Sequence, residues 1–224
     1  MSQHRIENSE KRNRVSRAFT LIELIVVCAI IVMIASLILA NHGRFGGQVL
    51  LQNFAYDVAL SLRQAQVYGI SVQRFGEASD RRFNAGYGIF IGNTPTTEYV
   101  LFADSDPLPP ALPNNWYTEG SDEVRTRNSI NRGYVIEKIC VPAGADTSCH
   151  AVDNLHIVFL RPEPDAWISW KELGASGALN ECTESSYDEG ECGPSARIVM
   201  KSPRGELMSV IVYNNGQIAV DNAN

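Results

Sequence analysis

The sequence predicts an α+β protein in which a long N-terminal helix, half transmembrane and half amphipathic, packs on an antiparallel β-sandwich-like head. Three patterns along the 224 residues predict this class. An apolar segment, residues 19–40, comes first, and an apolar stripe of helical period follows it to about residue 75. From residue 76 onward, short segments of alternating apolar residues are separated by turn-forming residues.

Residues 19–40 are long enough to cross a membrane once, because about 20 apolar residues span a bilayer as a helix. Glu23 is the only charged residue among them. Residues 1–18 carry five Lys or Arg against two Glu, an excess that holds a preceding segment in the cytoplasm. We therefore expect a single-pass inner-membrane protein with a cytoplasmic N-terminus and a periplasmic head, residues 76–224.

The small residue of a cleavage site precedes the apolar segment here, whereas in a secretory signal peptide it follows that segment. Cleavage between Ala18 and Phe19 would remove residues 1–18 as a leader and leave the helix on the mature chain. A carboxylate in a spanning segment costs roughly 2.5–3.5 kcal/mol on insertion scales, so Glu23 needs a partner. The new α-amine of Phe19 on a neighbouring copy would supply one.

The run Ala18-Phe19-Thr20-Leu21-Ile22-Glu23 resembles the type III signal of type IV pilins and type II secretion pseudopilins. The resemblance implies that prepilin peptidase cuts between Ala18 and Phe19 and that the amine of Phe19 is methylated. It also implies that Glu23 pairs with a neighbour's N-terminus during assembly. Ala18 stands where the family usually has glycine. The alternative is a periplasmic binding module that uses residues 19–40 only as an anchor and is not cleaved.

The helix is expected to continue over residues 41–75. Apolar residues recur there at steps of three and four, whereas Gln52, Asp57, Arg63 and Gln64 fall outside the stripe. The stripe comprises Leu51, Phe54, Ala55, Val58, Leu62, Ala65, Gly69 and Val72. Three glycines within residues 43–47 weaken the helix and predict a flexible segment, either a linker or a place where the helix bends.

Seven segments of the head are predicted to be strands: residues 86–92, 98–104, 134–140, 154–161, 166–170, 196–202 and 207–213. Asn215-Gly216 predicts a two-residue hairpin turn before a last strand. Residues 104–116 contain four prolines and are expected to form a loop. The strands should form two packed sheets, one of which buries the helix stripe.

The long helix followed by an all-strand head that ends in "VIVYNNGQIAV" resembles the GspH/FimT group of minor pseudopilins and minor pilins. This implies a low-copy subunit at or near the tip of a filament, with other pilins or pseudopilins as partners. The filament is the pseudopilus of a type II secretion system or, alternatively, a type IV pilus involved in pilus biogenesis or DNA uptake.

Nucleic acid is not an expected partner. Some FimT-type members bind DNA through a Gly-Arg-x-Arg ending, and the corresponding residues here, 216–219, lack both arginines. Loss of the leader changes the net charge from −6 to −9, because five basic and two acidic residues leave with it. Acidic domains are poor phosphate binders.

Four cysteines of the head, Cys140, Cys149, Cys182 and Cys192, favour two disulfides in the oxidising periplasm. Four cysteines allow three connectivities, and the local pairs 140–149 and 182–192 are preferred. Cys140, Cys149 and His150 could instead bind zinc, although their spacing matches no standard finger. His156 lies in a strand pattern, where a structural role is expected. No catalytic motif is found, so neither an enzymatic activity nor a cofactor is predicted.

The segment "ECTESSYDEGEC", residues 181–192, contains five acidic residues. It is expected to be a solvated loop closed by a disulfide, and a calcium site is an alternative because hard oxygen ligands are clustered. A partner surface is a third possibility, with Tyr187, Trp167 and Trp170 as contacts.

Overall fold

The structure is a computed structural model. It describes residues 19–71, 85–104, 114–120, 123–144, 149–174, 179–183 and 192–222, and backbone only for residues 40–45, 123 and 179. The chain divides into two compact units, residues 1–44 and residues 45–224, which are treated separately below. The predicted leader, the acidic residues 184–191 and most of the proline-rich segment lie outside the described residues.

Helix α1 runs from Leu21 to Ile70, and its backbone remains helical through Gly43, Gly46 and Gly47. A helical backbone is compatible with a rigid helix and with one that bends, so flexibility at these glycines stays a prediction. The apolar stripe is confirmed in the second unit: Leu51, Ala55, Val58, Leu62 and Ala65 are buried, and Val72 lies outside the described residues. The four polar residues named above as outside the stripe are exposed. Burial of the stripe against the sheet, rather than helix propensity, stabilises this half of α1.

Ten strands follow among the described residues. They are β1 (Gly86–Gly92), β2 (Glu98–Asp104), β3 (Glu123–Ser129), β4 (Val135–Cys140), β5 (Ala151–Phe159), β6 (Ala166–Glu172), β7 (Leu179–Asn180), β8 (Ser195–Lys201), β9 (Leu207–Tyr213) and β10 (Ile218–Asp221). The seven predicted strands are present with ends shifted by at most three residues, as is the expected last strand. The sequence analysis missed β3 and β7.

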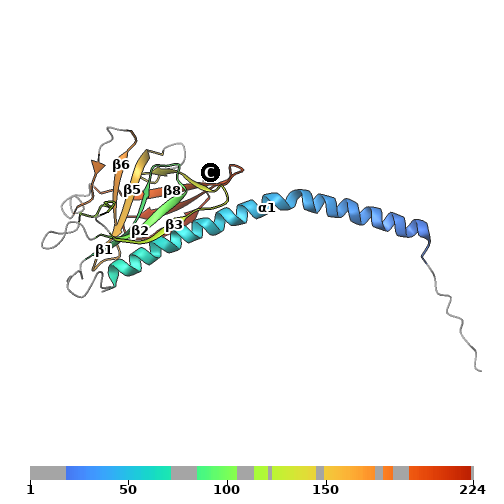
Figure 1. Ribbon diagram of the computed structural model, residues 1–224, viewed down its shortest axis with the longest axis horizontal. Helices are drawn as coiled ribbons and strands as arrows, with labels where there is room; N and C mark the ends of the chain where they lie inside the picture. The colour runs from blue at the N-terminus through green and yellow to red at the C-terminus, as the bar shows by residue number, and fades with distance from the viewer. Residues whose placement is uncertain are drawn as a thin grey trace, which may run out of the picture. The chain divides into compact units, whose positions relative to one another are not determined.

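The strands pair antiparallel in the order β10-β9-β8-β4-β5-β1-β2-β3, and β6 extends the sheet from the other edge of β5. Strand β5 joins two groups of strands, because β1 and β4 pair with different parts of the same edge of β5. The α+β class is confirmed, but the strands expected in two separate sheets are linked into one. In Figure 1 the second half of α1 runs alongside this sheet.

The predicted turn at Asn215-Gly216 joins β9 to β10 but is one residue longer than expected. The N–H of Tyr213 donates to the carbonyl of Gln217, so residues 214–216 form a three-residue loop. Gly216 has a φ of 76°, a conformation that glycine adopts without strain and that three-residue hairpins require at this position.

The sheet buries apolar residues on both faces. On the α1 face, Ile89, Leu101, Leu155 and Ile157 join the helix stripe in the main core. On the opposite face, Val100, Phe102, Val158 and Tyr117 form a smaller core together with half-buried neighbours that include Trp167. Since Tyr117 comes from the segment between β2 and β3, that segment covers this face of the sheet.

Gly69 brings the end of α1 against the backbone of β5. A Cβ atom at this position would lie 2.3 Å from the carbonyl oxygen of Phe159. Only glycine therefore allows α1 and β5 to approach this closely.

Candidate functional site

The start of α1 contains the residues that the sequence analysis assigned to processing and assembly. Phe19 and Thr20 precede the helix, and the side chain of Phe19 is 77% exposed. Ala18 lies outside the described residues. The structure therefore places one side of the predicted cleavage site, at an accessible position directly before the first helical turn.

Thr20 caps α1, a role that the sequence analysis missed. Its Oγ1 accepts a hydrogen bond from the backbone N–H of Glu23 at 3.3 Å, and its carbonyl accepts one from the N–H of Leu24 at 3.2 Å. The spacing of Thr20 and Glu23 is that of a capping box, a signal that the sequence already contained. A carboxylate in the first turn is also stabilised by the positive end of the helix dipole.

Residues 21–39 form a helix long and apolar enough to cross a membrane, and none of them is buried within the structure. Glu23 is exposed on this helix, as are the apolar side chains around it. An apolar surface this long needs lipid or other helices as its surroundings. The pairing of Glu23 with a neighbour's amine stays a prediction.

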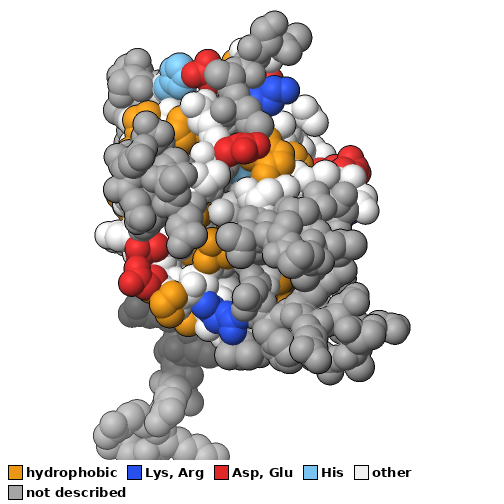
Figure 2. All heavy atoms as spheres, turned by 90° about the vertical axis from the view of Figure 1, so that its left-hand side faces the viewer, with side chains coloured by type: hydrophobic (Ala, Val, Ile, Leu, Met, Phe, Trp, Pro, Cys, Tyr) orange, Lys and Arg blue, Asp and Glu red, His pale blue; other side chains and the backbone are white. Residues whose placement is uncertain are grey.

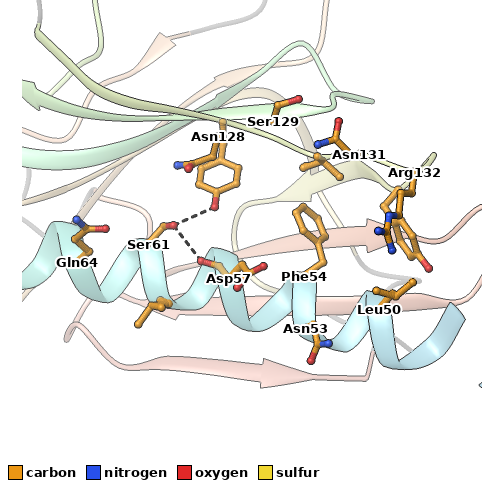
Figure 3. Close-up of a pocket in the computed structure, with 14 residues that line it drawn as sticks. Leu50, Asn53, Phe54, Asp57, Ser61, Gln64, Asn128, Ser129, Asn131 and Arg132 are labelled. Atoms are coloured by element: carbon orange, nitrogen blue, oxygen red, sulfur yellow. Dashed lines mark hydrogen bonds between the residues drawn. The ribbon is translucent and has the colours of Figure 1, made fainter. Parts of the chain in front are cut away.

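The second unit has a groove between α1 and strand β3, with a volume of about 460 Å³. Figure 3 shows Asp57, Ser61 and Gln64 on the helix side, and Asn128 and Ser129 on the strand side. Tyr99 of β2 also lines the groove. Its hydroxyl and Ser61 Oγ are hydrogen-bonded at 3.0 Å, and Ser61 donates to the carbonyl of Asp57. Burial raises the pKa of Tyr99, so this hydroxyl stays protonated.

Disulfides join Cys140 to Cys149 and Cys182 to Cys192, with Cα–Cα distances of 5.2 and 5.0 Å. These are the two local pairs that the sequence favoured. The zinc alternative was wrong, because a thiolate site cannot use Cys140 and Cys149 while they are bonded to each other. His150 instead lies 3.8 Å from Glu172, with both side chains exposed.

His156 on β5 is buried behind the segment that crosses the outer face of the sheet. Its Nδ1 accepts a hydrogen bond from the backbone N–H of Tyr117 at 2.9 Å, and its ring stacks against Trp116. Burial holds the pKa of His156 well below its ordinary value, so the imidazole is neutral. Its position agrees with the structural role expected from the strand pattern.

The two tryptophans proposed as partner contacts are half-buried. Trp167 packs in the smaller core and Trp170 against the main core. Tyr187 and the acidic residues 184–191 lie outside the described residues, so the calcium and partner-surface alternatives stay predictions. Among the residues that the structure describes, no group of three His, Cys, Asp or Glu side chains could hold a metal ion.

The C-terminal hairpin contains residues 216–219, and the expectation that nucleic acid is not a partner stays a prediction. Gly216, Gln217, Ile218 and Ala219 form the turn and the start of β10. Figure 2 shows one face of the molecule, on which the described acidic and basic side chains are interspersed rather than gathered by sign.

Comparison with known proteins bears on the N-terminal segment. Residues 13–39 match the family model described as the prokaryotic N-terminal methylation motif. No curated protein and no solved structure matches the chain. The chain thus carries a type IV pilin-type methylation signal directly before and within the helix that is long and apolar enough to cross a membrane.

Proposed function

We propose that this protein is a minor pseudopilin, a structural subunit at or near the tip of a type II secretion pseudopilus, and that it acts in protein secretion across the outer membrane. The methylation signal over residues 13–39 carries the proposal. The chain is made as a precursor and is itself a substrate of prepilin peptidase, which cuts between Ala18 and Phe19 and methylates the amine of Phe19. No enzymatic activity of its own is proposed.

The start of α1 supports this role. Cleavage would place the new amine of Phe19 only four residues before Glu23, at the end of a helix whose apolar surface is exposed. A neighbouring subunit that packs its helix alongside, displaced along the helix axis, would bring its own amine to this carboxylate. Enclosure by apolar helices then makes the pair stabilising and an unpaired Glu23 costly.

The head supports a structural role as well. The head is held together by two disulfides, by an apolar core on each face of the sheet and by the helix packed along it. Such a head is suited to a structural role. The described part of the head offers hydrogen-bonding and aromatic side chains along the groove beside α1, which suit contacts with other proteins.

Processing is the experiment that tests the proposal. Mass spectrometry of the chain extracted from membranes of cells with active prepilin peptidase should show a mature protein that begins with N-methylated Phe19. Ala18→Gly should be processed at least as well, whereas Ala18→Leu should block cleavage. An intact leader on the wild-type chain would favour the membrane-anchored binding module instead.

A second experiment separates the two filament systems. Deletion of the gene should abolish secretion of type II substrates and leave surface pili intact, since the subunit is assigned to the pseudopilus. Loss of pili with normal secretion would favour a minor pilin of a type IV pilus. Both readouts are compared with a strain complemented by the wild-type gene at normal membrane abundance.

A further inference from the structure

We infer that the edge of β3, together with the groove beside α1, binds an extended segment of a partner protein as an added β-strand. The partner strand that fits has apolar side chains on one face and carboxylates on the other. The inference rests on the geometry of the head and does not depend on the proposed function.

Strand β3 is a free edge of the sheet among the described residues, because it pairs with β2 and with no other described strand. The N–H of Ile130 donates to the carbonyl of Thr97, and hydrogen-bonded pairs alternate along an antiparallel ladder. The backbone groups of Thr126 and Asn128 therefore face β2. Those of Arg127 and Ser129 point away from it, and an added strand could bond to them.

A groove runs between this edge and α1. The hollow of about 460 Å³ lies between α1 and the end of β3, and a second hollow of about 220 Å³ lies between α1 and the start of β3. Gln64 lines both, so the two adjoin. A groove between a helix and a free strand edge is the arrangement in which peptides add to a sheet, with backbone hydrogen bonds supplying affinity and side-chain contacts supplying specificity.

The side chains on the two faces of β3 set the chemistry of the partner. Thr126 and Asn128 lie on the face toward α1, opposite Leu101 and Tyr99, whereas Val124 packs on the outer face against the smaller core. Apolar contacts in the groove are available from Phe54, Leu60 and Ile130. On the outer face Arg127 is about half exposed and 3.3 Å from the solvent-exposed carboxylate of Glu119. An added strand would therefore place apolar residues toward the groove and acidic residues beside Arg127.

A second copy of β3 is a poor occupant. The segment from Glu123 to Arg132 contains three basic residues, Arg125, Arg127 and Arg132, against one acidic residue, Glu123 at its start. Two such strands side by side would bring like charges together, which destabilises strand pairing. Charge complementarity therefore selects a different, acidic strand.

The test uses the full-length chain in detergent micelles and a fluorescein-labelled peptide of alternating Val and Glu, seven residues long, with binding followed by anisotropy. Two matched peptides carry methyl groups on the Glu nitrogens or on the Val nitrogens. In an antiparallel added strand the Glu nitrogens face β3, so methylation there should weaken binding at least tenfold, whereas methylation of the Val nitrogens should leave it nearly unchanged. A peptide of alternating Val and Lys should bind at least tenfold more weakly.

Two variants of the chain complete the test. Ser129→Pro removes one outward N–H without removing a bond to β2, since edge strands accept proline at such positions, and it should weaken binding at least fivefold. Arg127→Glu should also weaken peptide binding at least fivefold. Arg204→Glu, an equal charge change in the turn between β8 and β9, should leave peptide binding unchanged. Equal affinity of all four peptides, or wild-type affinity of both β3 variants, would overturn the inference. So would a dimer of the chain that Ser129→Pro dissociates, because β3 would then pair with its own copy.

Discussion

The side-chain nitrogen of Gln66 donates a hydrogen bond to the backbone carbonyl of Gly216, 3.0 Å away and 150 residues further along the chain. The same nitrogen donates to the carbonyl of Pro164 at 2.8 Å, and the side-chain oxygen of Gln66 accepts from Arg63 at 2.7 Å. One buried amide on α1 thus holds two separate turns of the head. It lies on the helix face that is otherwise apolar.

Replacing Gln66 with Leu should lower the free energy of unfolding of the head by about 1–3 kcal/mol, because two buried carbonyls lose a donor. Gln64→Ala is the matched control. Gln64 is exposed on the same helix, and its loss should change stability by less than about 0.5 kcal/mol. Urea unfolding followed by tryptophan fluorescence measures both variants. Equal stability of the two would show that Gln66 does not tie α1 to the turns.

Two glycines of α1 should respond to alanine in opposite directions. Gly→Ala normally stabilises a helix by about 0.5–1 kcal/mol, and at Gly46 no atom lies within 4 Å of the added Cβ. At Gly69 the Cβ would lie 2.3 Å from the carbonyl of Phe159, so α1 must shift away from β5. We expect Gly69→Ala to lower the melting temperature and Gly46→Ala to keep or raise it. A rise for both would mean that the contact between α1 and β5 is not restrictive.

His156 should make the head less stable as the pH falls below about 6.5. The folded state holds the pKa of His156 well below 6.5 by burial, so the unfolded state binds the proton more readily in that window. Stability is fully present above the unfolded pKa and is lost as the pH falls toward the folded pKa. His156→Asn, which keeps an acceptor for the N–H of Tyr117, should flatten this dependence between pH 7 and pH 5.

Chemical denaturation at several pH values measures this slope, and His150→Asn is the control because His150 is exposed. An unchanged slope in His156→Asn would assign the pH dependence to other groups.

Each disulfide should stabilise the head by about 2–3 kcal/mol, since each closes a short loop in the unfolded chain. The double variant Cys182→Ser, Cys192→Ser should also loosen the segment over the outer face. Asn115 of that segment donates to the carbonyl of Cys182, whose own N–H donates to Ser169. Peptide mapping without reduction should recover the pairs 140–149 and 182–192, and a link from Cys140 to Cys182 or Cys192 would contradict the structure.

Glu23 variants separate a capping role from an assembly role. Glu23→Gln keeps a side chain that suits a capping box but removes the charge, whereas Glu23→Ala removes both. If Glu23 pairs with a neighbour's amine, membrane insertion should stay intact in both variants. Entry into the filament should fall most for Ala and less for Gln.

Recovery of each variant with sheared filaments, at equal membrane abundance, measures assembly. Thr20→Val is the control for the cap alone. If the Glu23→Ala variant assembles as well as the wild type, Glu23 is not an assembly contact.

The sequence by itself determined the features that repeat locally. The spacing of Leu51, Ala55, Val58 and Leu62 determined which face of α1 is buried, and alternation of apolar residues located β1, β2 and β9 with the ends that the structure shows. The methylation signal was likewise visible from residues 18–23 alone. These features follow from side-chain periodicity and from short motifs, which need no knowledge of distant contacts.

Tertiary structure alone decided the rest. Strand β3 is polar and lies at the edge of the sheet, so it lacks the apolar alternation that marks a half-buried strand. The linkage of the strands into one sheet depends on which partners β5 finds at each end. Gln66 and Gly69 acquire their roles from backbone groups at least 90 residues away, Gly216 and Phe159. A hydrogen bond or a close approach of this kind depends on both partners. The residues next to one partner in the sequence do not indicate which distant residue the other partner is.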